Sequence, residues 1–285
     1  GIGSGESAIR LGWGPGKFVA WVAATRAKPG DAVIVGVNGV FGTRLATVIE
    51  RCGGKAIRLE IPWGQVIPTE MIESALRRSG PVKAVALVHA ETSTGACQPL
   101  EAIGSLCRDH NALLIVDAVT SLGGIPVDVD RLGIDICYSA TQKCLSCPPG
   151  LAPLTLSPRA LSIIKGRRTP CRSWYLDMAL VAEYWAEESR AYHHTAPISM
   201  IYALREALRL VEEEGLPARV VRHRLNGEAL VAGLMELELT PLPLTEHRLS
   251  MLTCVTIPPH IDEAAVRQQL LQIYGIEIGG GLGPL

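Results

Sequence analysis

The sequence lacks an excess of charge of either sign. Its formal net charge at pH 7 is −1 over 285 residues, and acidic and basic residues are interspersed without a block of like charges. Proteins that bind nucleic acid or anionic membranes usually carry a concentrated basic patch. We therefore expect neither nucleic acid nor a membrane as partner, and a small molecule as ligand.

Long apolar runs and a secretory signal are also missing. No apolar stretch is long enough to span a bilayer. The eight cysteines are scattered through apolar segments instead of forming a dense framework, which is typical of reduced, cytosolic proteins. We expect a soluble, cytoplasmic protein, or a peroxisomal or mitochondrial one if the source is eukaryotic.

Cys144 and Cys147 form the exceptional cysteine pair. A Cys-x-x-Cys spacing can serve a metal ion or a redox switch. No second pair and no nearby histidine completes a zinc site. We therefore predict no metal and interpret both cysteines as neighbours of a site, and we interpret the adjacent His193 and His194 as structural residues.

Short β-rich runs alternate with helical stretches between residues 31 and 140. The expected strands are 31–37, 56–62, 82–90, 112–119 and 134–140. The expected helical stretches are 43–53, 68–80, 100–111 and 129–133. The strand candidates are continuously apolar, as strands buried on both faces of a parallel sheet are. The pattern predicts a doubly wound α/β fold.

The pattern changes after residue 160. Apolar positions at helical spacing over 198–215 and 219–237 predict a long helical connection. Strand, helix and strand are then expected at 250–258, 262–275 and 276–281, with Asp262 as an N-cap. We divide the chain into a glycine-rich segment, a large α/β domain, and connecting helices with a small, incomplete C-terminal α/β domain: residues 1–28, 29–200 and 201–285.

Polar groups follow three of the expected strands, in "HAETSTG" (89–95), "VDAVTS" (116–121) and "YSATQK" (138–143). Ligands of open α/β sheets collect at the carboxyl ends of strands. A carboxylate at the end of a buried strand needs a cationic or hydrogen-bonding partner, so Asp117 must have one. Lys143 ends a strand of the same predicted sheet, and an amine and an acid in one cleft suggest pyridoxal phosphate.

Six ordered motifs carry a resemblance to a known family. They are "HAETSTG", "LLIVDAVTSLGG", "DICYSATQK", "WYLDM", "AYHHTAP" and "IEIGGGLG". They resemble the class V aminotransferases of fold type I, most of all the alanine-glyoxylate / serine-pyruvate group, from about residue 29 to the end. The resemblance implies a large domain with a mainly parallel, doubly wound sheet, and pyridoxal 5′-phosphate as cofactor. It also implies transfer of the amino group of alanine or serine to glyoxylate or pyruvate.

The resemblance assigns roles to individual residues. Lys143 is similar to the lysine that forms a Schiff base with the cofactor, and Asp117 to the acid that pairs with the pyridine nitrogen. Thr92 corresponds to a hydroxyl near the ring O3′, while Val119 and Phe41 correspond to residues that pack on the two ring faces. The implied phosphate ligands are Ser139 and Gln142 of the same chain and Tyr192 and Thr195 from a neighbouring subunit. A homodimer with shared sites follows from this resemblance.

The sequence also departs from the family. The phosphate loop is expected either at Ser4, Gly5 and Glu6 or, by distance from "PGD", at "GWGPG" (12–16), and the glycine-rich start is otherwise a flexible terminus. The chain ends at Leu285, before the arginine with which the family binds the substrate carboxylate. Two alternatives therefore stay open: a truncated relative with cofactor but little activity, and a pyridoxal-phosphate-dependent lyase or cysteine desulfurase.

Overall fold

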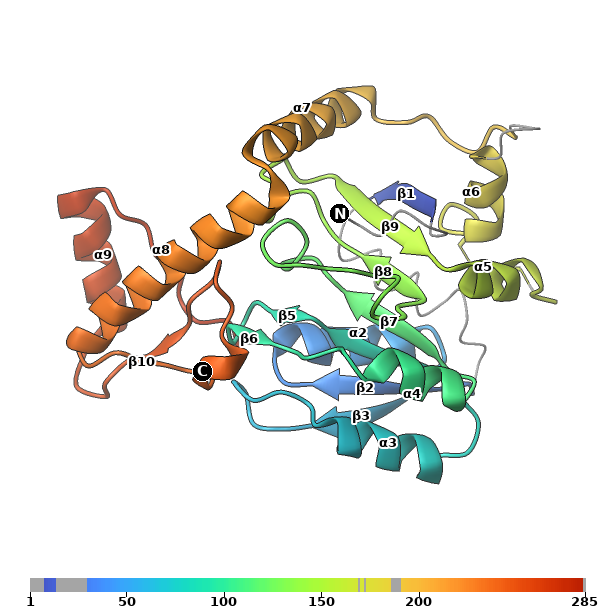
Figure 1. The fold of residues 1–285 in the computed structure, drawn as a ribbon, viewed down its shortest axis with the longest axis horizontal. Coiled ribbons are helices and arrows are strands. Elements are labelled where there is room, and N and C mark those ends of the chain that lie inside the picture. The colour runs from blue at the N-terminus through green and yellow to red at the C-terminus, as the bar shows by residue number, and fades with distance from the viewer. Residues whose placement is uncertain (1–7, 14–29, 169, 172, 186–190, 284–285) are drawn as a thin grey trace.

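The structure, a computed structural model, describes residues 8–13, 30–168, 170–171, 173–185 and 191–283. Its centre is a seven-stranded sheet of order β1-β9-β8-β7-β4-β2-β3 (Figure 1). Neighbours from β3 to β8 pair in parallel, whereas β9 is antiparallel to both β8 and β1. The strands are β1 (Ala8–Trp13), β2 (Ala32–Val37), β3 (Lys55–Glu60), β4 (Val82–Val88), β7 (Leu113–Asp117), β8 (Ile136–Tyr138) and β9 (Leu151–Leu156).

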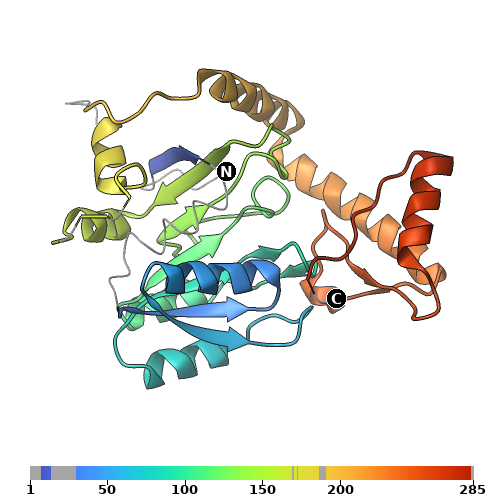
Figure 2. The same cartoon turned by 180° about the vertical axis from the view of Figure 1, so that it is seen from behind.

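Helices cover both faces of this sheet. Buried residues of α2, α5 and α6 pack on one face, called here the α2 face, and those of α3 and α4 pack on the other, the α3 face. Figure 2, seen from behind, brings α2 to the front. These helices are α2 (Val40–Arg51), α3 (Thr69–Arg78), α4 (Ile103–Asp109), α5 (Pro158–Lys165) and α6 (Met178–Tyr184).

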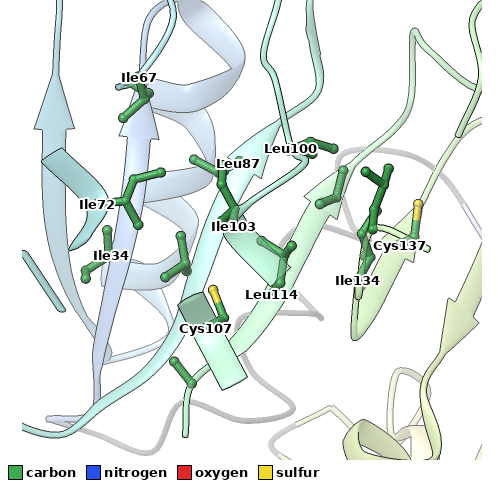
Figure 3. Packing of buried hydrophobic residues seen from close by; sticks show 14 of the residues in the cluster. Ile34, Ile67, Ile72, Leu87, Leu100, Ile103, Cys107, Leu114, Ile134 and Cys137 are labelled. Atoms are coloured by element: carbon green, nitrogen blue, oxygen red, sulfur yellow. The ribbon is translucent and has the colours of Figure 1, made fainter. Parts of the chain in front are cut away.

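The core on the α3 face consists of aliphatic side chains from strands and helices. Ile34, Leu87 and Leu114 of three neighbouring strands lie in one cluster with Ile72 of α3 and Ile103 of α4 (Figure 3). Each of the five is at most 1% exposed. Complete burial of such a side chain stabilises the fold by roughly 1.5–3 kcal/mol, so this layer holds the sheet rigid beneath the strand ends.

Strand β7 explains why the expected strands read as continuously apolar. Leu113 and Ile115 belong to the core of the α2 face, whereas Leu114 and Val116 belong to the core of the α3 face. Successive side chains of a strand point to opposite faces, and here both faces are covered. The predicted doubly wound α/β fold is therefore confirmed, and the same alternation directs the next residue, Asp117, to the α2 face.

Two further helices lead from the sheet to a small C-terminal unit. α7 (Ile198–Glu214) and α8 (Leu216–Glu236) are separated by Gly215, whose φ of 79° lies in the left-handed region that favours glycine. The two expected helical stretches are thus α7 and α8, and α8 runs out to the C-terminal unit (Figure 1). That unit contains α9 (Glu263–Tyr274), whose predicted N-cap, Asp262, accepts a hydrogen bond from the Ala265 N–H.

Several short elements complete the structure. They are β5 (Ala90–Glu91), β6 (Ala96–Cys97), β10 (Thr240–Pro241), β11 (Val255–Thr256) and a 3-10 helix (Thr245–His247). β5 and β6 pair with each other, as do β10 and β11. Within the described residues, none of the helices is both long and apolar enough to cross a membrane.

Three expectations about individual elements are wrong. Residues 129–133 form turns instead of a helix, and 276–281 are exposed and form no strand. Only Val255–Thr256 of the expected strand 250–258 pairs, with β10. A strand needs a partner for its backbone groups, and the described chain offers none to 276–281. β1 and β9, both missed from the sequence, extend the sheet beyond β8, and the proposed domain boundaries stay a prediction.

Candidate active site

The carboxyl ends of β4, β7 and β8 lie at one edge of the sheet, because these strands are parallel neighbours. This confirms that the three polar motifs of the sequence meet at that edge. The strand order turns back between β2 and β4, since β3 lies on one side of β2 and the later strands on the other. Such switch points form the usual ligand crevice of open α/β sheets.

Asp117, the last residue of β7, is a buried acid that is held from two sides. Its Oδ1 accepts a hydrogen bond from the Val119 N–H at 2.9 Å, and its Oδ2 accepts one from the Tyr138 hydroxyl at 2.8 Å. These are the partners that the sequence required. Burial nevertheless raises the pKa of Asp117 to about 6, against the lowering effect of the two hydrogen bonds. Among the described residues the carboxyl has two neutral donors and no ion pair, although the charge of Arg44 also lowers its pKa.

Glu91 fixes the start of α2 above the site. Its carboxylate is fully buried and accepts hydrogen bonds from the N–H groups of Phe41, Gly42 and Ser93 and from the Ser93 hydroxyl. The first N–H groups of a helix lack partners within the helix, and a negative charge at this end is favourable. Glu91 thus caps α2 from another strand and sets the position of Phe41.

Phe41, Val119 and Thr92 are placed near this edge as the sequence suggested, but their roles toward a ring stay predictions. Phe41 is half-buried in the first turn of α2, and Val119 packs partly buried against the core of the α2 face. The Thr92 hydroxyl lies 2.5 Å from the Thr120 hydroxyl. That contact ties the loop after β4 to the turn after Asp117.

Lys143 lies in the loop between β8 and β9, half-buried, five residues beyond the last residue of β8. Its backbone carbonyl accepts a hydrogen bond from the Ser146 N–H at 2.9 Å, so the loop folds into a turn. Leu145 anchors this turn against Leu204 of α7. Among the described residues, the Lys143 amine has neither a hydrogen bond nor an ion pair, and its pairing with Asp117 across one ring stays a prediction.

The structure gives Ser139 another partner than a phosphate. Its side chain is 1% exposed, and its hydroxyl donates a hydrogen bond to the Ala118 carbonyl at 2.9 Å. A hydroxyl has one proton to donate, and a phosphate oxygen would need it. Gln142 is half-buried, and its buried Oε1 has no partner among the described residues. That oxygen accepts hydrogen bonds, so only the amide NH₂ of Gln142 could serve a phosphate, and this role stays a prediction.

The residues expected to serve a neighbouring subunit lie on the surface. Tyr192 is 76% exposed, Thr195 is exposed as well, and their hydroxyls are 2.9 Å apart. None of the described residues covers them, which is compatible with a contact to a second copy. Ser4, Gly5 and Glu6 lie outside the described residues.

Sequence reasoning missed three residues that shape the site: Glu91, Tyr138 and Arg219. Glu91 follows a buried strand, as Asp117 does, and the same solvation rule could have found it. Tyr138 faces Asp117 only through the register of β7 and β8, in which the two residues pair directly. Arg219 is a 7% exposed arginine on α8, and no local pattern distinguishes it from its exposed neighbours.

Comparison with known proteins gives a consistent result. The chain is 41% identical over 282 residues to the (S)-ureidoglycine–glyoxylate transaminase of Bacillus subtilis, covering 93% of this chain and 67% of that protein. It is 40% identical over 260 residues to the alanine–glyoxylate aminotransferase of Oryctolagus cuniculus, covering 90% and 66%. The chain therefore spans about two thirds of the length of these relatives.

Similarity extends to the three-dimensional structure. The crystal structure of an alanine–glyoxylate aminotransferase from Nostoc sp. superposes with a TM-score of 0.93 at 45% identity, covering 99% of this chain and 74% of that one. Residues 17–283 also match the family model described as aminotransferase class-V. Together with the buried acid and the lysine loop at one edge of a parallel sheet, these matches show that the chain belongs to the class-V aminotransferase family.

Proposed function

We propose that the chain is a transaminase that moves the amino group of a small amino acid, alanine or serine, to glyoxylate or pyruvate. Pyridoxal phosphate is the cofactor of its family. Two relatives named above, from Bacillus subtilis and Oryctolagus cuniculus, are glyoxylate transaminases by name. The observation that carries the proposal for this chain is the environment of Asp117.

The residues at this edge of the sheet fit the cofactor. Asp117 is 6% exposed, its two partners are neutral donors, and burial raises its pKa to about 6. None of the described cations forms an ion pair with this carboxylate, and a buried carboxylate without such a pair is costly. The protonated nitrogen of a pyridine ring is a cation of suitable size. The site therefore lacks the kind of partner that the cofactor brings.

When bound, pyridoxal phosphate supplies a ring that accepts electrons from the substrate. Asp117 accepts the N–H of that ring and keeps the nitrogen charged, while Tyr138 and Val119 hold the carboxylate in place. Lys143 Nζ is the amine that would hold the cofactor covalently, and as the freed amine it would serve as base and acid for the substrate Cα proton. The turn closed by Ser146 presents that amine.

Further contacts are proposed by position. Phe41 and Val119 would pack on the two faces of the ring. Thr92 would form a hydrogen bond to the ring hydroxyl, and Gln142 would donate one to the phosphate. The assignment of Ser139, Ser4, Gly5 and Glu6 as phosphate ligands stays a prediction.

A homodimer would supply the remaining phosphate contacts. Tyr192 and Thr195 lie exposed and hydrogen-bonded to each other, which supports a role toward a second copy of the chain. Each site is then completed by two chains.

A cysteine desulfurase is less well supported by the thiols near the site. Burial raises the pKa of both Cys144 and Cys254. The thiolate is the reactive form of cysteine, and these two thiols are kept protonated. The eight cysteines are scattered through apolar segments, a usage typical of reduced proteins, which supports the proposal of a reducing, cytoplasmic location.

The proposal is tested by loading the protein with pyridoxal phosphate and recording its absorption spectrum. We expect a visible band that borohydride removes, with the label left on Lys143. L-alanine should bleach the band and glyoxylate should restore it. Lys143→Ala should abolish the label completely, whereas Lys165→Ala, which changes an exposed lysine at the end of α5, should leave it unchanged.

The outcomes separate the alternatives. A label on another lysine would overturn the assignment of Lys143. A normal band that alanine does not bleach would support the relative that binds the cofactor without turnover. Conversion of cysteine to alanine, with the sulfur released as sulfide by an added dithiol reductant, in place of alanine-dependent bleaching, would support the desulfurase.

A further inference from the structure

Arg219 is a buried arginine whose hydrogen bonds reach both loops of the proposed active site. Its guanidinium Nη2 donates to the Cys144 carbonyl at 2.6 Å and to the Ser146 hydroxyl at 3.2 Å. Its Nε donates to the Gly123 carbonyl at 3.1 Å. Arg219 lies in the first turn of α8, so one side chain connects this helix to the Lys143 loop and to the loop after Asp117.

The acceptors of Arg219 lie next to the groups that do the chemistry. Cys144 directly follows Lys143, and Gly123 lies in the turn that begins immediately after Asp117. The Cys144 thiol also contacts the Thr120 carbonyl at 3.3 Å. The two loops therefore touch each other, and the guanidinium holds them from the same side.

The charge of Arg219 is balanced by a carboxylate that lies outside the two loops. Its Nη1 pairs with Glu214 at 2.8 Å, and Arg222 pairs with the same carboxylate. The planar guanidinium presents its donors in a fixed fork, so binding to Glu214 orients the Nε and Nη2 donors toward the two carbonyls. A lysine has a single ammonium group and cannot reproduce this geometry.

The apolar side of the Lys143 loop is held by a second helix. Leu145 and Cys147 are buried in one cluster with Leu204 and Ala207 of α7. The loop is therefore fixed by packing from α7 and by hydrogen bonds from α8. Packing alone leaves rotation about the backbone open, whereas hydrogen bonds to the carbonyl after Lys143 restrict the direction in which its side chain leaves the loop.

We propose that Arg219 is a positioning residue of the transamination site: it fixes the Lys143 loop against the turn after Asp117 and so sets where the lysine amine lies relative to the acid. This inference rests on the proposed function for the role of Lys143. The hydrogen bonds from Arg219 to the two loops do not depend on that function. A purely structural arginine would contribute to stability without any specific effect on Lys143.

Arg219→Met tests whether Arg219 holds the two loops together, with Arg222→Gln as the matched control. Methionine fills a similar volume without donors, and Glu214 keeps its bonds from Arg222. Arg222 lies on the same helix and binds the same carboxylate, but it is half-exposed, and among the described residues its side chain bonds to Glu214 alone. Arg219→Lys keeps the positive charge, so it provides a second test if Arg219→Met fails to fold.

Two measurements report directly on the Lys143 loop. Hydrogen exchange of the protein without cofactor should rise in peptides covering 141–147 and 118–125 of Arg219→Met and stay unchanged over 113–117. The rate at which pyridoxal phosphate becomes fixed to Lys143, measured by borohydride trapping, should fall roughly tenfold or more, since small misplacements of a reacting group are costly. Arg219→Lys should recover part of both effects, and Arg222→Gln should match the parent chain.

The results distinguish the two proposals. Unchanged exchange and unchanged trapping in a folded Arg219→Met or Arg219→Lys variant would overturn the positioning role, as would an equal rise in exchange over the whole chain. If the parent chain never attaches the cofactor to Lys143, the proposed function fails, while the exchange data still decide whether Arg219 holds the loop.

Discussion

The proposed acid and the proposed amine are held by two different kinds of structure. Asp117 belongs to a strand, and its two donors are Val119 in the turn that directly follows and Tyr138 in the neighbouring strand. The Lys143 loop depends on α7 and on Arg219, which is 75 positions from Cys144. The acid is thus part of the rigid sheet, whereas the loop that carries the amine is held by helices outside the sheet.

This difference has a consequence for how the site responds to change. Core residues on both faces of β7 shield the strand that carries Asp117, so distant substitutions are expected to move this strand less than the loops around it. The Lys143 loop lies between the sheet and the two helices that lead to the C-terminal unit. Changes in those helices are therefore expected to act on the amine before they act on the acid.

The largest effect is expected for the acid itself. Asp117→Asn keeps the volume of the side chain and one of its two acceptor oxygens, but a neutral amide cannot hold a charged ring nitrogen. We expect kcat for alanine and glyoxylate to fall by at least about a hundredfold, as on removal of a preorganised electrostatic group, while thermal unfolding shows an intact fold. Asp109→Asn, at an exposed acid on the end of α4, is the control. Full activity of Asp117→Asn would remove the acid from the mechanism.

The next effect concerns the helix that packs on the lysine loop. Leu204 of α7 is 5% exposed and contacts the cluster of Leu145, so Leu204→Ala should cost about 2–5 kcal/mol of unfolding free energy through the cavity it leaves. Hydrogen exchange at sub-denaturing urea should rise over 143–147 more than over 113–117.

Leu208→Ala on the same helix, where the side chain is 46% exposed, should change stability by no more than about 0.5 kcal/mol. An equal rise in exchange at both segments of Leu204→Ala would show that the two groups are not held separately.

The smallest effect concerns pH. The pKa of Asp117 is raised to about 6 in the folded chain, so the folded state binds a proton more tightly than the unfolded state between about pH 4 and pH 6. Its contribution to stability is present below this window and is lost as the pH rises through it. The free energy of unfolding should therefore drop by up to about 3 kcal/mol across the window.

Asp117→Asn removes this contribution. Urea unfolding of both proteins without cofactor, at several values between pH 4 and pH 7, should show the smaller decline in the variant. Other titrating groups affect both proteins alike and cancel in the difference. Parallel curves would mean that the acid is not buried in the way the structure shows.

Some parts of the molecule could be predicted from local patterns. The parallel strands were recognisable because a run such as Leu113 to Val116 is apolar at every position, which only a sheet covered on both faces requires. Asp262 was recognisable as an N-cap because capping depends on neighbours within one turn. Asp117 was recognisable because its solvation cost is independent of which partner relieves it.

Other parts gave no such signal. β9 contains Pro153, which has no N–H for a sheet and therefore argues against a central strand, yet β9 lies between β1 and β8. The predicted strand 276–281 has the right residues but no partner in the described chain. Ser139 has the right type and position for a phosphate ligand, and its hydroxyl is instead bound to the Ala118 carbonyl.

The order of residues alone thus decided the fold class, the sheet edge at which the site lies, and the acid that needs a partner, because each depends on local patterning and solvation. Which groups meet there was decided only by packing. Tyr138 reaches Asp117 through strand register, and Arg219 reaches Gly123 across 96 positions of chain. Such contacts arise when elements that are each stable in their own pattern are placed against one another, and nothing local encodes that placement.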